Sequence, residues 1–399
     1  MTFKLKNILL FFLIMLPFGN FPQLFNLGED TGSIYISVII GILVLIWFVN
    51  ERKIFIPKYI KNRILLYFLL LGFLLDIVSI ALGTVSFEIG LSSSLNFTLS
   101  KLVLIYVIIV IAERLNIFES IDLLTYFTII LMLSLIISLI VYPLNPIPEF
   151  VIYDGGTRFG GFHFELVNFT FSVLVGFFVY SFHRGFSIYK FFIALVLIYF
   201  LSKSNGFYPF VLAALFAILI ARIRNKFLLK GLVASIILIT PIIGIFLDYF
   251  SFLEVFSVRA STDFTIEGSS LFVRLYPWAL AMNHFLETFL YFPIGLGMLE
   301  ASPYILEVEN LYGGTGITKV IAEFGFISIL FIPFIYFYFV NIFKNIFNIE
   351  DTNSRLCFSA ILILVLTYIC MQSGFFNLTA WCLCIMIQNI SIRYISGNK

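Results

Sequence analysis

Three arginines, Arg158, Arg259 and Arg274, lie in polar stretches between long apolar runs. Guanidinium is a planar fork that binds phosphate or carboxylate with two hydrogen bonds, so three of them together could hold a diphosphate. Glycines flank Arg158, and glycine lets backbone N–H groups approach an anion closely. Each arginine could instead form an ordinary surface ion pair with a nearby carboxylate.

Candidate proton acceptors lie in the same stretches. Glu165, Glu309 and Glu323 stand at or near the edges of apolar runs, where partial burial would raise a carboxyl pKa toward neutrality and suit a general base. The alternative is that they are the ion-pair partners of the arginines. His284 has no second His or Cys nearby, so it is interpreted as a solvated side chain or a base and not as a metal ligand.

Several classes of function are excluded by what the chain lacks. All four cysteines lie in the last two apolar segments, so no polar loop carries a disulfide or thiolate metal ligands. Neither a P-loop nor a strand followed by GxGxxG is present, which argues against an ATPase or a nucleotide-sugar enzyme. The net charge of +2 gives no basic field for nucleic acid. We expect no cofactor and no metal.

The composition places these residues in a membrane protein. The 399 residues are 61% hydrophobic and 12% charged, with mean hydropathy +1.08, and a membrane-spanning helix needs about 20 apolar residues. We predict an all-α, polytopic bundle of about twelve spans, in which residues 1–399 form a single transmembrane domain. The predicted spans are 7–25, 33–50, 64–82, 96–113, 122–143, 164–182, 188–204, 207–222, 229–247, 317–340, 356–373 and 378–395. The break between 188–204 and 207–222 is short enough to be a re-entrant turn instead.

Charge distribution orients the predicted spans. Most Lys and Arg residues fall on one side when both termini are cytoplasmic, as the positive-inside rule requires. Two larger segments, 144–163 and 248–316, then lie on the outer face and contain the three arginines. The second keeps many aromatic residues and a helical rhythm from Leu271 to Phe289, so we expect interfacial helices there. Asp76 is the acid nearest the middle of a span, which favours a transporter as an alternative.

Three stretches of the sequence resemble the motifs of a known family of membrane proteins. They are RFGGFHFELVN from Arg158 to Asn168, VRLYPWALAMNHFLETFLYFPIGLGM from Val273 to Met298, and ENLYGGTGITKVIAEFG from Glu309 to Gly325. In order and spacing they resemble the arginine, glycine and asparagine signatures of the O-antigen polymerase and ligase superfamily of membrane glycosyltransferases. The likeness covers most of the chain, including the long outer loop before the last three predicted spans.

The resemblance implies roles for particular residues. Arg158 and Arg274 would be catalytic, with Glu165, Glu309 or Glu323 as the base, and Gly161, Asn168, Arg259, His284 and Asn310 would bind substrate. Tyr276 and Trp278 could stack on sugar rings. Ligases of the superfamily usually have histidine where Glu309 precedes Asn310, which favours a polymerase. Some polymerases have glycine eleven positions after each arginine, whereas Phe169 and Phe285 stand there, so the exact catalytic scheme does not transfer.

The activity implied is polymerisation of undecaprenyl-diphosphate-linked oligosaccharide repeat units at the outer face of the inner membrane. The partners expected from it are that lipid-linked oligosaccharide and the lipid bilayer, with a polysaccharide chain-length regulator as a further candidate and no nucleic acid. A transporter or flippase of lipid-linked sugars is the alternative in another class, and it predicts a central polar cavity around Asp76. An O-antigen ligase differs from the polymerase only in its acceptor.

Overall fold

The computed structural model describes residues 6–15, 56–81, 102–141, 152–153, 158–159, 166–202, 207–249, 316–324, 327–371 and 377–397. These residues are helical apart from short connections and one pair of two-residue strands, which confirms the all-α prediction. The helices are α1 (Lys6–Met15), α3 (Ile60–Ala81), α5 (Leu104–Ala112), α6 (Ile117–Val141), α8 (Leu166–Arg184), α9 (Ile188–Ser202), α10 (Phe207–Ile223), α11 (Lys226–Tyr249), α15 (Gly316–Phe324), α16 (Ser328–Phe347), α17 (Thr352–Met371) and α18 (Leu378–Gly397).

Most predicted spans correspond to helices, and one does not. The apolar run 317–340, predicted as a single span, is divided between α15 and α16. Gly325 follows α15 directly, and glycine is a poor residue for a helix interior. The predicted span 33–50, residues 16–25 of the first span and residues 96–101 of the fourth lie outside the described residues.

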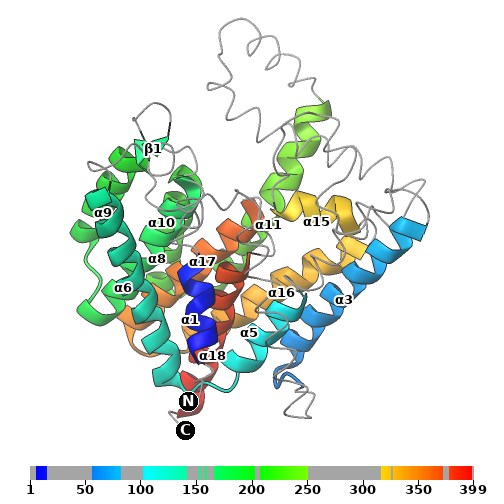
Figure 1. The fold of residues 1–399 in the computed structure, drawn as a ribbon, viewed down its shortest axis with the longest axis horizontal. Coiled ribbons are helices and arrows are strands. Elements are labelled where there is room, and N and C mark those ends of the chain that lie inside the picture. Colours follow the sequence, from blue (N-terminus) through cyan, green and yellow to red (C-terminus); the bar gives the residue numbers. More distant parts are fainter. Residues whose placement is uncertain are drawn as a thin grey trace, which may run out of the picture.

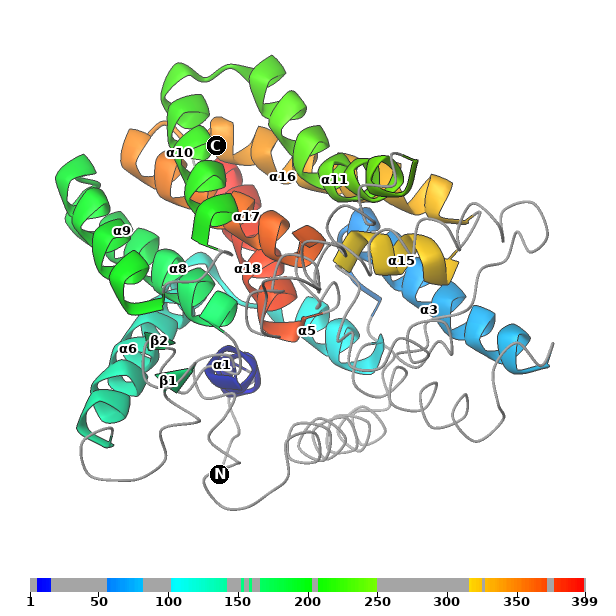
Figure 2. The same cartoon turned by 90° about the horizontal axis from the view of Figure 1, so that it is seen from above.

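Helix α17 is the centre of the bundle (Figures 1 and 2). It packs against α8, α10, α11, α15, α16 and α18, and 94% of its apolar stretch is buried inside the protein. An apolar helix that is buried on every side must lie in the core of a larger bundle. The axis of the bundle is therefore filled by a helix.

One end of the bundle collects basic residues, and we call it the basic end. There α17 begins beside the end of α10, because Arg355 Nε donates to the Ala221 carbonyl at 3.1 Å. The start of α6 meets the end of α8 through Thr125 Oγ1 and His183 Nε2, 2.8 Å apart. Similar contacts place the start of α3 and the ends of α5 and α18 at this end.

The opposite end receives the two long predicted loops, and we call it the loop-bearing end. Helices α8 and α18 begin there, and α17 ends there, as the contact between Tyr368 and Asn168 shows. Helices α6 and α11, which start at the basic end, run toward it (Figure 1). The end of α6, the start of α8 and the end of α11 therefore lie at this end, next in the sequence to the predicted loops.

The outer surface of the bundle is apolar. Leu133 on α6 is 50% exposed and Phe200 on α9 is 68% exposed, which would be unfavourable in water but suits contact with lipid tails. Within the described residues three helical stretches are long and apolar enough to cross a membrane, namely Ile117–Ser138, Ser328–Phe347 and Thr352–Met371. These features are compatible with a membrane protein. The total of about twelve spans stays a prediction.

Candidate functional site at the loop-bearing end

Arg158 lies in a short β-hairpin. Strand β1 (Ile152–Tyr153) pairs antiparallel with β2 (Arg158–Phe159), and Tyr153 is opposite Arg158 in the register. The sequence Asp-Gly-Gly-Thr between the strands is turn-forming, because glycine adopts the left-handed conformations that tight hairpin turns need. Strand β2 lies beside α9, so the backbone of Arg158 is at the loop-bearing end (Figures 1 and 2).

Three polar side chains meet at the same end of the bundle. The Tyr368 hydroxyl, on the last turn of α17, donates to Asn168 Oδ1 on the first turn of α8 at 2.7 Å. Asn377 Nδ2, just before α18, donates to the same hydroxyl at 3.3 Å. Asn377 also caps α18, since its Oδ1 accepts from the Ala380 N–H at 3.0 Å. We call Asn168, Tyr368 and Asn377 the polar triad.

Aromatic packing fixes the triad. The Tyr368 ring is stacked on Phe171 with ring centroids 4.5 Å apart, and Phe210 lies on it at 6.4 Å. Tyr368 is 4% exposed, whereas Asn168 is only part-buried. Because the Oδ1 atom of Asn168 is held by the tyrosine, its Nδ2 is directed elsewhere. That amide nitrogen has no acceptor among the described residues, so it can donate to a ligand.

The structure describes few of the other residues predicted for the site. Glu323 lies in the last turns of α15, which packs against α17 and α3. Asp76, the residue that favoured a transporter, lies in α3. The remaining predicted site residues fall outside the described residues: Gly161, Glu165, Arg259, Arg274, Tyr276, Trp278, His284, Glu309 and Asn310.

Sequence reasoning found Asn168 but missed Tyr368 and Asn377. The two hydrogen bonds join residues that are distant along the chain, and no spacing rule connects them. One signal was present in the sequence, because the polar residues Tyr368 and Asn377 bracket the short break between the last two apolar runs. Polar side chains at adjacent ends of consecutive antiparallel helices are expected to approach one another.

A second polar cluster, at the basic end, was also missed. The Glu113 carboxylate, which is 8% exposed, accepts from the backbone N–H groups of Lys58 and Tyr59 and from Asn62 Nδ2 at 2.8 Å. Asn62 Oδ1 in turn lies 3.0 Å from the Tyr338 hydroxyl. A buried carboxylate with several donors is satisfied by them. This cluster therefore ties the segment before α3 to the core.

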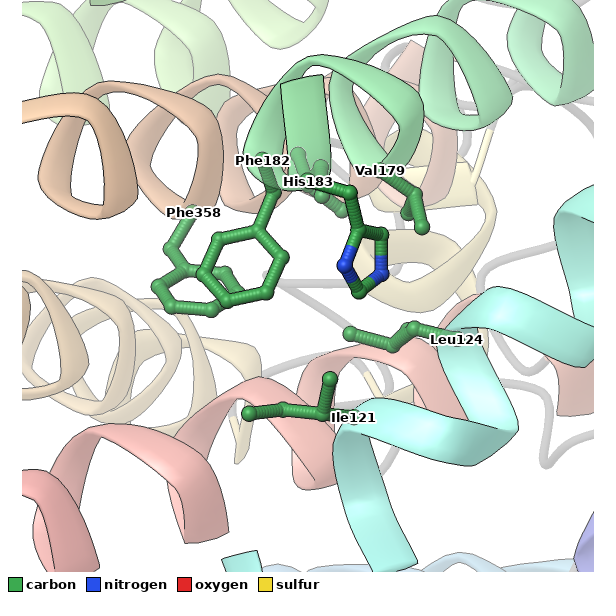
Figure 3. Close-up of a pocket in the computed structure, with 7 residues that line it drawn as sticks. Ile121, Leu124, Val179, Phe182, His183 and Phe358 are labelled. Atoms are coloured by element: carbon green, nitrogen blue, oxygen red, sulfur yellow. The ribbon is translucent and has the colours of Figure 1, made fainter. Parts of the chain in front are cut away.

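The basic end also has an apolar hollow between α6, α8 and α17 (Figure 3). Its walls include Leu124, Phe182 and Phe358, and the His183 ring points toward Leu124 in Figure 3. Thr125 Oγ1 lies 3.0 Å from the Ile121 carbonyl oxygen and 2.8 Å from His183 Nε2, so the hydroxyl links the two helices. The hollow has no room for a water molecule, so we interpret it as imperfect packing.

Within the described residues, no group of three or more His, Cys, Asp or Glu side chains is placed to hold a metal ion. The chain matches no family model, no curated protein and no solved structure. Because it combines the Arg158 hairpin with the polar triad, the loop-bearing end is the part of the described structure best suited to bind a polar ligand.

Proposed function

We propose that the protein is a membrane glycosyltransferase that polymerises undecaprenyl-diphosphate-linked oligosaccharide repeat units. The observation that carries the proposal is the common position of its parts. The Arg158 hairpin and the polar triad lie at the loop-bearing end, and the segment that contains Arg274 follows in the sequence after α11, which ends there. An enzyme acting on a lipid-linked diphosphate at the membrane surface needs cations and polar donors together at one end of its bundle.

The reaction joins two lipid-linked substrates. A sugar hydroxyl of a new repeat unit attacks the anomeric carbon of the growing chain, and the bond from that carbon to the diphosphate oxygen breaks. The undecaprenyl diphosphate leaves with the electron pair, and Arg158 and Arg274 stabilise its charge. The hydroxyl proton passes to a carboxylate, with Glu165, Glu309 and Glu323 as the candidates.

The polar triad has a binding role in this proposal. Asn168 Nδ2 donates to a sugar or phosphate oxygen of the substrate, and Tyr368 holds the amide in the orientation that presents this nitrogen. A fixed donor loses less conformational entropy on binding than a freely rotating one. Asn168 therefore contributes to substrate affinity, whereas the arginines and the base carry out the chemical step.

The transporter alternative has less support from the described residues. It requires a central polar cavity that opens to each side in turn, whereas α17 occupies the centre of the bundle and is packed on all sides. The ligase alternative would use the same site with a different acceptor. A product assay separates the three functions.

The test is the glycan ladder of a strain that lacks the protein. A polymerase predicts loss of long chains while a single repeat unit is still transferred to its final acceptor. A ligase predicts loss of all transfer, and a flippase predicts accumulation of lipid-linked units on the cytoplasmic side. In the complemented strain, Arg158→Ala should abolish chain extension at normal expression. Arg158→Lys should also lose most chain extension, because lysine lacks the bidentate fork.

A further inference from the structure

The turn between α10 and α11 concentrates positive charge at the basic end. Arg222, Arg224, Lys226 and Lys230 fall within nine residues, and all four are exposed. None has a carboxylate partner among the described residues. Four neighbouring cations without acidic partners repel one another, so an anion bound there would stabilise the turn.

The same turn exposes large apolar side chains. Phe227 is 82% exposed and Ile223 is 55% exposed. They lie where the apolar helix α10 ends and α11 begins, so they are at the edge of the apolar surface of the bundle. Basic residues interleaved with exposed aromatic and aliphatic side chains are typical of the interface between lipid headgroups and water.

Arg224 has an unfavourable backbone conformation. Its φ is 55°, and its N–H bonds to the Ile220 carbonyl at 2.9 Å, which makes it the left-handed residue that ends α10. Glycine adopts this conformation without steric cost and is the usual residue there. An arginine in its place is strained locally, and local strain of this kind points to a use for the side chain.

The turn is held in place by neighbouring groups. Asn225 Oδ1 accepts from the Phe227 and Leu228 N–H groups at 2.9 and 3.1 Å, so the first turn of α11 is already capped. The Arg222 guanidinium lies 6.0 Å from the centre of the Phe186 ring. An anion at this turn would therefore be bound by the side-chain cations and not by the backbone N–H groups at the start of α11.

We propose that this basic turn, Arg222–Lys230, binds the phosphate headgroups of anionic phospholipids in the leaflet at the basic end. The cations contact the phosphodiesters, while Ile223 and Phe227 enter the boundary between headgroups and acyl chains. Attraction between a basic segment and an anionic membrane surface increases with each lysine or arginine near the surface. This binding is independent of the activity proposed for the loop-bearing end.

The experiment uses the full chain in neutral-detergent micelles doped with phosphatidylglycerol or with phosphatidylcholine. Thermal unfolding gives the stabilisation by each lipid, and native mass spectrometry counts the bound lipids. Phosphatidylglycerol should raise the unfolding midpoint more than phosphatidylcholine does. Replacing all four turn cations by glutamine should weaken phosphatidylglycerol binding by at least about tenfold. If that variant does not fold, Lys226→Gln with Lys230→Gln should weaken binding by a smaller factor.

A matched control removes four exposed cations elsewhere at the basic end, by the changes Lys58→Gln, Arg184→Gln, Lys190→Gln and Lys344→Gln. Phosphatidylglycerol binding should fall much less in this control than in the turn variant, because its four cations are not gathered in one turn. Arg224→Gly should raise the unfolding midpoint without lipid, because the strain is relieved, and yet weaken phosphatidylglycerol binding. If Arg224 had only a structural role, the change to glycine would raise the unfolding midpoint without weakening phosphatidylglycerol binding.

Three outcomes would overturn the proposal. The control could lose as much binding as the turn variant, which would indicate a general effect of charge. Inorganic phosphate at equal concentration could stabilise the protein as much as phosphatidylglycerol does, which would indicate a site for free anions. A soluble polyglutamate could displace phosphatidylglycerol from the turn completely, which would indicate an acidic protein as the partner.

Discussion

The side chain of Asn168 shows how packing orients a polar donor. A free asparagine amide rotates, and its oxygen and nitrogen exchange places. In this protein the Tyr368 hydroxyl occupies the oxygen at 2.7 Å, and Phe171 stacks on the tyrosine ring at 4.5 Å. Two α-helices and one hydrogen bond thus determine which atom of the amide is available to a ligand.

Tyr368→Phe tests this role of the hydroxyl group. The phenylalanine ring keeps the stacking on Phe171 and Phe210, while the hydrogen bond to Asn168 and the longer one from Asn377 are lost. We expect a higher KM for lipid-linked substrate with a smaller effect on kcat, and a loss of stability of about 1 kcal/mol, as for a typical hydrogen bond. Kinetics of the purified enzyme with lipid-linked repeat units would measure both constants.

The matched control is Tyr338→Phe in the middle of α16. Tyr338 is also buried, and its hydroxyl lies 3.0 Å from Asn62 Oδ1 and 2.9 Å from Gln388 Oε1. The control should lose similar stability and keep its KM. If the two variants changed KM equally, Tyr368 would be a purely structural residue. In an Asn168→Ala background, Tyr368→Phe should add little to KM, because the group that it positions is already gone.

At the scale of elements, helix α17 depends on the cap at its start. The Asp351 carboxylate accepts from the Ser354 N–H at 2.8 Å, from the Ser354 hydroxyl and from the Asn353 N–H at 3.3 Å. Burial raises the pKa of Asp351, but these hydrogen bonds and the charge of Arg355 outweigh burial, so the pKa is lowered from its ordinary value of 3.8. The ionised cap is therefore favoured in the folded state.

Asp351→Ala should destabilise the protein by about 1 kcal/mol at neutral pH, the usual cost of losing an N-cap. Because the folded pKa is below the unfolded one, the stabilisation by ionised Asp351 is complete above the unfolded value and is lost as pH falls through the folded value. The difference in unfolding midpoint between wild type and Asp351→Ala should thus shrink below about pH 4. Asp351→Ser, which keeps a capping oxygen, should be milder; equal losses for both variants would exclude capping as the cause.

The elements of this protein were predictable where apolar runs are bounded by polar residues. Helix α10 was predicted as 207–222 and spans Phe207–Ile223. The division of 317–340 into α15 and α16 was missed because both parts are apolar and hydropathy does not detect a break between them. The β1–β2 hairpin was also missed, although a glycine pair between short β-prone stretches indicates one.

The candidate site was predictable only in its local part. Asn168 was found through the sequence pattern that begins at Arg158, whereas Tyr368 joins it from another helix. Glu113 was missed for the same reason, since its donors Tyr59 and Asn62 precede it by more than fifty residues. Side-chain partners across a bundle depend on how the helices rotate about their axes, which one sequence does not specify.

For the whole molecule, the alternation of the helices predicts which segments share a side of the membrane. Cysteine at Ser269, in the long loop, should react with an impermeant maleimide in intact spheroplasts. Cysteine at Glu350, which is exposed at the basic end, should react only after permeabilisation. The four native cysteines are buried, so they should give little background. Labelling in the opposite sense would place the arginine-containing loops in the cytoplasm and exclude the proposed function.

The two proposed catalytic arginines are far apart in the sequence, but their segments connect to one end of the bundle. Arg158 is in strand β2 beside α9, and Arg274 belongs to the sequence between α11 and α15. An exposed ion pair with one arginine contributes only about 1 kcal/mol. Stabilising a departing diphosphate therefore requires both guanidinium groups at one cavity.

We accordingly predict that Arg158→Ala and Arg274→Ala are strongly non-additive. Each single change should remove nearly all chain extension, because the remaining arginine cannot stabilise the leaving group alone. The double variant should then lose little more, as for residues that act as a unit. The measurement is a double-mutant cycle, in which the rates of chain extension of the wild type, the two single variants and the double variant are compared at matched expression. If each single change caused a moderate loss and the double loss were their product, the arginines would act independently. Arg274 would then be an ordinary surface residue, and the diphosphate would have to be bound elsewhere.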